Sequence, residues 1–239
     1  MTALLELEAV CAGYGGSDVL RELDLRVAAG SVTCIVGPNG AGKSTVLRLV
    51  SGLLRAREGD VRFDGRSIRG WSPRAILDLG IVQVPQERSL FPTMTVEENV
   101  RLGGYRLHDR SLVERRLRAV GEAFPIVRER GRERAAALSG GQQKLVEFAR
   151  AMMLEPRLLL LDEPSMGLDP RTRAAVFETI QRLNGEGRTV LLVEQNARSG
   201  LTLASDGIVM ESGRVRLSGP GSEILASREI ADLYLGRAG

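Results

Sequence analysis

The chain has 239 residues, of which 43% are hydrophobic and 26% charged, and its formal net charge is +3. This length suits one large domain or two small ones, and the composition is that of a soluble globular protein. No uninterrupted apolar run exceeds four residues, which excludes a helix that spans a membrane. The first residues lack a basic segment followed by a long apolar core, so we expect no signal peptide and a cytoplasmic protein.

Composition also argues against two common kinds of site. The mild positive charge does not predict a nucleic-acid surface, because no basic run is interleaved with aromatic residues. The two cysteines, Cys11 and Cys34, lie in strand-like stretches, where buried and reduced thiols are expected. Together with a single histidine, they cannot supply the ligands of an ordinary zinc site.

The N-terminal stretch predicts an antiparallel pair of strands. Residues 3–10 and 19–27 alternate between apolar and polar side chains, and a turn rich in glycine separates them. Tyr14 is expected in that turn, either as a packed aromatic or as a platform on which a base can stack. The β-branched run at residues 31–36 predicts a further strand that leads into a glycine-rich segment.

That segment, GPNGAGKST at residues 37–45, predicts a phosphate-binding loop. It matches G-x-x-x-x-G-K-[ST], in which backbone N–H groups surround a phosphate chain and the next helix points its positive end at it. Lys43 is expected to reach the β- and γ-phosphates, and the Ser44 hydroxyl to bind Mg²⁺. Only Lys43 and Lys144 are lysines among the 33 basic residues, and a compact ammonium suits a phosphate cradle. The residues expected to contact nucleotide here are Gly37, Pro38, Asn39, Gly40, Ala41, Gly42, Lys43, Ser44 and Thr45.

The chain then passes into a region of mostly helical character, predicted for residues 87–154. Before it, a helix is expected at residues 43–51, strands at 59–63 and 81–84, and a helix start at Ser72 followed by Pro73. Within it, Thr95 and Ser111 each precede a glutamate by three residues. This spacing is that of a capping box, so each serine or threonine is predicted to begin a helix.

The C-terminal part alternates strands with helices. The predicted elements are a buried strand at residues 157–163, a helix from Asp169 to about Asn184, a strand at 189–194, a hairpin at 207–218 and a helical tail from Ser222 to about Gly236. Alternating strands and helices indicate a largely parallel sheet with both faces covered. Ligands of such sheets lie beyond the carboxyl ends of the strands, so groups that follow different strands can converge there.

Two acids at the end of the strand 157–163 indicate hydrolysis. Asp162 is placed to hold Mg²⁺ through water, and Glu163 to orient and deprotonate an attacking water. The alternative is a pair of exposed acids at a strand end. Gln86, which follows another strand and a proline, is suited to touch both Mg²⁺ and the water.

The stretch LSGGQQ predicts a second anion site. Ser139 and Gln142 form a capping-box pattern at the start of a helix, and the N-terminus of a helix attracts anions. The residues of this site are Ser139, Gly140, Gly141 and Gln142. Because the chain carries two phosphate-binding surfaces, we expect a head-to-tail dimer in which each nucleotide lies between the loop of one subunit and the serine helix of the other.

Together these motifs resemble the nucleotide-binding subunit of an ATP-binding cassette (ABC) transporter over the whole chain. The matches are residues 37–45 to the Walker A motif, 158–163 to the Walker B strand with its catalytic glutamate, Gln86 to the Q-loop, 138–142 to the family signature, and 167–169 to the D-loop that ends in Asp169. The resemblance implies that Tyr14 stacks on adenine and that Asp169 contributes to nucleotide binding. It also implies catalytic roles for Glu163, Gln195 and Gln86, and Mg²⁺ binding by Ser44, Gln86 and Asp162.

The resemblance further implies the fold and the cofactors. The fold is α/β, with the parallel sheet core of a P-loop NTPase (RecA-like), an N-terminal antiparallel β subdomain and an inserted α-helical subdomain. Within a single ABC ATPase domain, residues 1–239, the nucleotide-binding core and β subdomain take residues 1–86 and 155–239. Residues 87–154 form the helical signature subdomain. The implied cofactors are ATP and Mg²⁺.

One position departs from the family pattern. Most ABC ATPases carry a histidine after the strand that here reads TVLLVE, whereas this chain has Gln195. Glutamine can donate a hydrogen bond to a γ-phosphate but cannot carry a positive charge. The stretches VEQNA, VEENV and DLYLG resemble the F-type ATPase subunit of branched-chain amino acid (Liv/HAAT) importers, and urea and amide importers share these features.

The resemblance therefore implies an ATPase subunit of an importer. Its partners would be transmembrane permease subunits and a second ABC ATPase subunit, of the same or a different kind, at the inner face of the cell membrane. Gln86 and the SLFPTM segment after it are expected to form the groove that contacts the permease. Alternatives are a soluble ABC protein acting on DNA or ribosomes, which usually has tandem cassettes or long coiled-coil insertions, and a nucleotide sensor without turnover.

Overall fold

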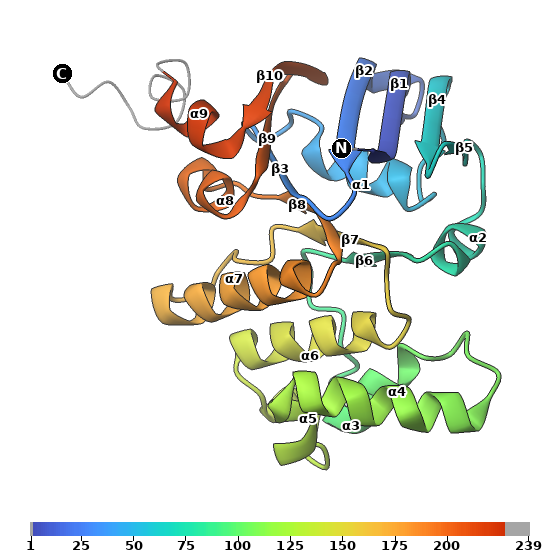
Figure 1. Cartoon of the computed structure of the whole chain (residues 1–239), viewed down its shortest axis with the longest axis vertical. Coiled ribbons are helices and arrows are strands. Elements are labelled where there is room, and N and C mark those ends of the chain that lie inside the picture. Colours follow the sequence, from blue (N-terminus) through green and yellow to red (C-terminus); the bar gives the residue numbers. More distant parts are fainter. Residues whose placement is uncertain (1, 228–239) are drawn as a thin grey trace.

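Two sheets and a group of helices form residues 2–227, the part of the chain that the structure describes, in the computed structural model of Figure 1. The strands are β1 (Ala3–Tyr14), β2 (Ser17–Ala28), β3 (Val32–Val36), β4 (Glu58–Phe63), β5 (Arg66–Ser67), β6 (Ile81–Val84), β7 (Leu158–Asp162), β8 (Thr189–Val193), β9 (Asp206–Glu211) and β10 (Arg214–Pro220). The helices are α1 (Lys43–Val50), α2 (Pro73–Asp78), α3 (Val96–Leu102), α4 (Arg110–Ala123), α5 (Pro125–Glu129), α6 (Gly140–Met152), α7 (Pro170–Gly185), α8 (Ala197–Leu203) and α9 (Gly221–Ala226), with a 3-10 helix at Ala135–Ala137. Of the tail predicted as helical from Ser222 to about Gly236, α9 confirms the first residues and ends at Ala226, whereas residues 228–236, which include the DLYLG stretch, lie outside the described residues.

The larger sheet has six strands in the order β10-β9-β3-β8-β7-β6, and all but β10 run parallel. Its central strands β3, β7 and β8 are buried along their whole length. Side chains from β7 alternate between two apolar clusters, because Leu159 and Leu161 pack on one face of the sheet and Leu158 and Leu160 on the other. This confirms the predicted parallel sheet with both faces covered, whose strands end at a common edge.

The smaller sheet is antiparallel, in the order β2-β1-β4-β5. Its first hairpin is longer than predicted, since strand pairing continues to Tyr14 opposite Ser17. Only Gly15 and Gly16 form the turn, both with positive φ, as a tight two-residue hairpin requires. The prediction that Tyr14 lies in the turn was wrong, because it is the last residue of β1.

The helical region lies at the opposite end of the molecule from the small sheet, below the large sheet in Figure 1. Thr95 caps α3 in the predicted capping box. The predicted box at Ser111 was wrong, because Asp109 is the N-cap of α4 and its carboxylate accepts hydrogen bonds from the N–H and hydroxyl of Ser111. Because the Asp109 carboxylate accepts the hydrogen bond from the Ser111 N–H at the start of the helix, Asp109 takes the capping position that was predicted for Ser111.

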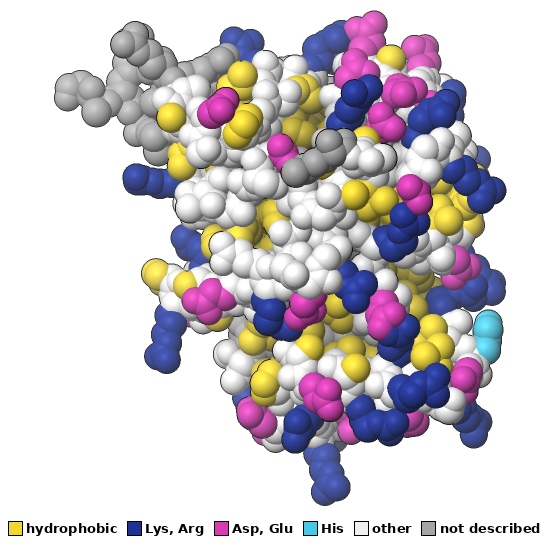
Figure 2. Space-filling view, in the orientation of Figure 1, with side chains coloured by type: hydrophobic (Ala, Val, Ile, Leu, Met, Phe, Trp, Pro, Cys, Tyr) yellow, Lys and Arg dark blue, Asp and Glu magenta, His cyan; other side chains and the backbone are white. Residues whose placement is uncertain are grey.

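No helix among residues 2–227 combines the length and the apolar character needed to cross a bilayer. Figure 2 shows basic and acidic side chains intermixed over one face of the molecule rather than separated into patches. Cys34 is buried and Cys11 half-buried, and both are free thiols as predicted.

Candidate functional site

The phosphate loop connects β3 to α1. Gly42 is the N-cap of α1 with φ of 100°, a conformation that glycine adopts at little cost. The Lys43 ammonium donates hydrogen bonds to the carbonyl oxygens of Gly37 (2.8 Å) and Pro38 (3.0 Å), so it lies inside the curve of the loop. Burial lowers the pKa of Lys43, and the neighbouring Glu163 and Asp162 act in the opposite direction. The phosphate loop therefore holds the Lys43 ammonium inside its own curve.

Two of the three residues predicted to hold Mg²⁺, Ser44 and Asp162, are in direct contact. The Ser44 hydroxyl donates a hydrogen bond of 2.9 Å to Oδ1 of Asp162, which ends β7. Burial raises the pKa of Asp162, and the hydrogen bond from Ser44 opposes that rise. A hydroxyl and a carboxylate are hard oxygen ligands, so this donor pair fits Mg²⁺.

Glu163 stands immediately after β7 in a strained conformation. Its φ of 44° lies in the left-handed region, which costs a non-glycine residue about 1–2 kcal/mol. The backbone N–H of Glu163 donates to the carbonyl of Val193 over 2.9 Å, which holds the residue against β8. The Gln86 amide donates to Oε2 of Glu163 over 3.1 Å and also contacts the Met166 sulfur. Burial raises the pKa of Glu163, which favours a group that can take up a proton.

One cleft of about 410 Å³ brings nine of the predicted site residues together, from the phosphate loop, the Q-loop and the ends of β7 and β8. It is lined by Val19, Asn39, Gly40, Gly42, Lys43, Ser44, Thr45, Gln86, Glu163, Met166 and Gln195. The Gln195 amide, which follows β8, lies 3.5 Å from Oδ1 of Asn39 in the phosphate loop. Val19 and Met166 are lining residues that the sequence did not reveal, because neither belongs to a motif with a chemical signature.

Tyr14 lies outside the lining of this cleft. Its side chain is exposed at the end of β1, and its hydroxyl accepts a hydrogen bond of 3.4 Å from Arg48 of α1. Its stacking role stays a prediction.

The signature residues also lie outside the cleft lining. Ser139 caps α6 as predicted, and the side-chain Oε1 of Gln142 accepts hydrogen bonds from the Ser139 N–H and from the Arg130 guanidinium. Gly141 packs so closely on α7 that a Cβ there would lie 1.9 Å from a methyl of Thr172. The signature residues of this chain therefore do not line the cleft that contains its phosphate loop.

Asp169, the last residue of the predicted D-loop, is the N-cap of α7. Its carboxylate accepts hydrogen bonds of 3.1 Å from the backbone N–H groups of Arg171 and Thr172. The hydrogen bond with the Thr172 side chain is the largest cause of a lowered Asp169 pKa, and the backbone bonds from Thr172 and Arg171 act in the same direction. Its role in nucleotide binding stays a prediction.

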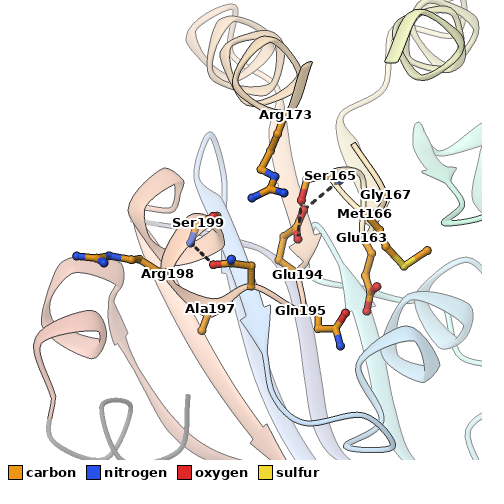
Figure 3. A pocket seen from close by; sticks show the side chains of 11 residues that line it. Glu163, Ser165, Met166, Gly167, Arg173, Glu194, Gln195, Ala197, Arg198 and Ser199 are labelled. Atoms are coloured by element: carbon orange, nitrogen blue, oxygen red, sulfur yellow. Dashed lines mark hydrogen bonds between the residues drawn. The ribbon is translucent and has the colours of Figure 1, made fainter. Parts of the chain in front are cut away.

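A second cavity, of about 560 Å³, shares Glu163 and Gln195 with the cleft and contains an acid that the sequence analysis missed. Glu194 is 2% exposed, and its carboxylate accepts hydrogen bonds from the N–H (3.2 Å) and the hydroxyl (3.0 Å) of Ser165. In Figure 3, Glu194 points toward Ser165, whereas Glu163 and Gln195 point to the opposite side. Burial raises the pKa of Glu194 to about 7. The sequence signal that could have revealed Glu194 is its position directly after an apolar strand and before Gln195.

Comparison with known proteins gives the family. The ABC transporter family matches residues 20–166. The high-affinity branched-chain amino acid transport ATP-binding protein BraG of Pseudomonas aeruginosa is 39% identical, over 98% of this chain and 100% of its own length. The probable branched-chain amino acid transport ATP-binding protein LivF of Archaeoglobus fulgidus is 34% identical, over 94% of this chain and 95% of its own.

Solved structures agree with the sequence relatives. A nucleotide-free ATP-binding cassette of an ABC transporter superposes with a TM-score of 0.88 at 28% identity, covering 99% of this chain and 100% of its own. A cassette in its ADP conformation gives a TM-score of 0.89 at the same identity and coverage. The chain belongs to the ABC transporter family, as an ATPase subunit that uses ATP with Mg²⁺.

Proposed function

We propose that this chain hydrolyses ATP to power an importer for branched-chain amino acids. The observation that carries the proposal is the cleft that Lys43, Ser44 and Glu163 line together, with Asp162 hydrogen-bonded to Ser44. The solute is inferred from relatives named for branched-chain amino acid transport that align over nearly the whole chain.

In the proposed mechanism, each residue of the cleft acts on one part of the nucleotide. Lys43 and the loop N–H groups bind the β- and γ-phosphates, where positive charge stabilises the transferring phosphoryl group. Ser44, Asp162 and Gln86 hold Mg²⁺, which neutralises charge on the phosphate oxygens when it is bound. Glu163 orients the attacking water and accepts its proton, and the Gln195 amide donates to the γ-phosphate.

A second subunit completes the site in this proposal. The signature residues Ser139–Gln142 do not line the cleft that contains the phosphate loop of the same chain. This supports a head-to-tail dimer in which the signature residues of each subunit complete the cleft of the other. Tyr14 would stack on adenine, and Asp169 would lie near the dimer contact. The partner is a second ABC ATPase subunit, identical or different.

The permease would dock on an apolar groove of about 470 Å³ beside the Q-loop. Phe91 and Tyr105 line it and are exposed, as is typical of a surface that binds another protein. Phe91 belongs to the SLFPTM segment that was predicted to form this contact. Through that docking, the subunit would lie at the inner face of the cell membrane.

Reconstitution of the subunit with its permease in vesicles tests the proposal. We expect ATP-dependent uptake of leucine, isoleucine or valine, and no uptake with the variant Glu163→Gln. Uptake of urea or a short amide instead would reassign the solute to the related importers. Failure to co-purify with any membrane subunit, together with co-sedimentation with ribosomes or binding to DNA, would overturn the transport role.

A further inference from the structure

A buried ion pair lies on the helix that begins with the signature. Lys144 and Glu147, one turn apart on α6, are 9% and 2% exposed, and the ammonium lies 2.6 Å from Oε2 of the carboxylate. Removing two charges from water is costly, so a buried pair by itself is a poor source of stability. The role of this ion pair is therefore sought in its contacts with the rest of the chain.

Those contacts all reach residues 85–89, called here the Q-loop segment. Oε1 of Glu147 accepts hydrogen bonds from the Ser89 N–H (2.7 Å) and hydroxyl (2.9 Å). The Lys144 ammonium donates to the Pro85 carbonyl over 3.3 Å, at the other end of the segment. Arg150, one turn further along α6, donates to the Ser89 carbonyl over 2.7 Å. Helix α6 thus holds both ends of the Q-loop segment by charge-assisted hydrogen bonds, which are stronger than neutral ones.

The Q-loop segment connects two sites. Gln86, between the two held ends, contacts Glu163 in the cleft. Glu147 and Arg150 line the apolar groove beside Phe91, which follows the segment by two residues. The ion pair therefore lies between the groove proposed for the permease and the residue proposed as the general base.

We propose that Lys144 and Glu147 are positioning residues that fasten the Q-loop segment to the signature helix, so that a displacement in the groove moves Gln86 and Ser139 as one body. The inference rests on the proposed function, because the groove matters only if a permease docks there. It also accounts for the second lysine of an arginine-rich chain: a compact ammonium fits between the Glu147 carboxylate and the Pro85 carbonyl, whereas a planar guanidinium is larger.

The test is the ratio of ATPase rates with and without the permease, measured on the assembled transporter and on the isolated subunit. The variant Lys144→Met/Glu147→Met removes both charges together, so neither partner is left buried alone, and Arg150 keeps its hydrogen bond to the Ser89 carbonyl. We expect its stimulation by the permease to fall about fivefold or more, the size of a typical coupling between sites. Faster amide exchange over residues 85–91 should accompany that fall. The control Glu114→Gln breaks an exposed ion pair with Arg101 in the same helical region and should leave the ratio unchanged.

The outcomes separate the two proposals. If the unmodified subunit neither binds nor responds to a permease, the proposed function fails. If it responds and the double variant keeps the same ratio, the fastening role is overturned. Should the double variant not fold, Lys144→Arg carries the test, because it keeps the charge and replaces the compact ammonium between Glu147 and the Pro85 carbonyl by a larger, planar guanidinium. An unchanged ratio in Lys144→Arg would then overturn the proposal, and a lowered one would support it.

Discussion

The Ser44 hydroxyl donates a hydrogen bond of 2.9 Å to the Asp162 carboxylate, and this contact joins two residues that lie 118 positions apart. It connects the first turn of α1 to the end of β7, so the fold places two of the three predicted Mg²⁺ ligands together at the carboxyl end of the sheet. A site assembled in this way needs little rearrangement to bind a hard cation. The predictions below concern the residues around this contact.

Replacement of the loop lysine should weaken nucleotide binding. Lys43→Ala removes the ammonium that lies within the loop, and we expect ATP affinity to fall about tenfold or more, since a hydrogen bond to a charged group contributes roughly 1.5–3 kcal/mol. Titration calorimetry on the folded variant measures the effect. Arg26→Ala, which removes a cation from the exposed face of β2, is the control and should bind normally. Equal affinity in Lys43→Ala would contradict the phosphate-loop assignment.

Glu163→Gln should separate binding from hydrolysis. The amide keeps the size of the side chain but cannot accept a proton, so turnover should fall about 10²–10⁴-fold while ATP still binds. Phosphate release measures the loss of turnover, and nucleotide binding measured on the same preparation shows whether ATP still binds. Near-normal hydrolysis by this variant would exclude Glu163 as the general base.

Gln195→Ala tests whether the amide that replaces the family's histidine takes part in turnover. Loss of one hydrogen bond to a charged phosphate should lower kcat about tenfold, given about 1.5 kcal/mol for such a bond, with little change in ATP affinity. Steady-state kinetics over a range of ATP concentrations separate the two effects. Unchanged kcat and KM would make Gln195 a spectator.

Glu194 should make the stability of the protein fall as the pH rises. Its pKa is raised from 4.5 to about 7 in the folded protein, so between these pH values the native state holds a proton that the unfolded state has lost. The stabilisation is fully present below pH 4.5 and is lost as the pH rises through about 7.

The variant Glu194→Gln removes this titration. Relative to the unmodified protein, its free energy of unfolding should therefore gain up to about 3 kcal/mol between pH 4.5 and 8. Denaturant unfolding at several pH values checks this, with the exposed Glu178→Gln on α7 as control. Parallel pH profiles for the unmodified protein and Glu194→Gln would refute the assignment.

Features that depend on neighbouring residues could be predicted from the sequence alone. The phosphate loop, the buried strands ending at Asp162 and at Val193, and the caps at Thr95 and Ser139 all follow from short patterns. Each pattern satisfies its backbone hydrogen bonds or its apolar burial within a few residues, so it forms in the same way in different surroundings. The family resemblance rested on the same local patterns.

The tertiary structure decided what depends on contacts between distant segments. Helix α6 meets the Q-loop segment through Glu147 and Ser89, and Glu194 meets Ser165, although no spacing in the sequence relates these pairs. Even the start of α4 depended on a competition between Asp109 and Ser111 that the pattern alone did not resolve. The sequence by itself determined which groups could bind phosphate and Mg²⁺. Packing of the sheet and helices decided which groups meet in one cleft, because burial and hydrogen-bond partners are properties of the folded chain.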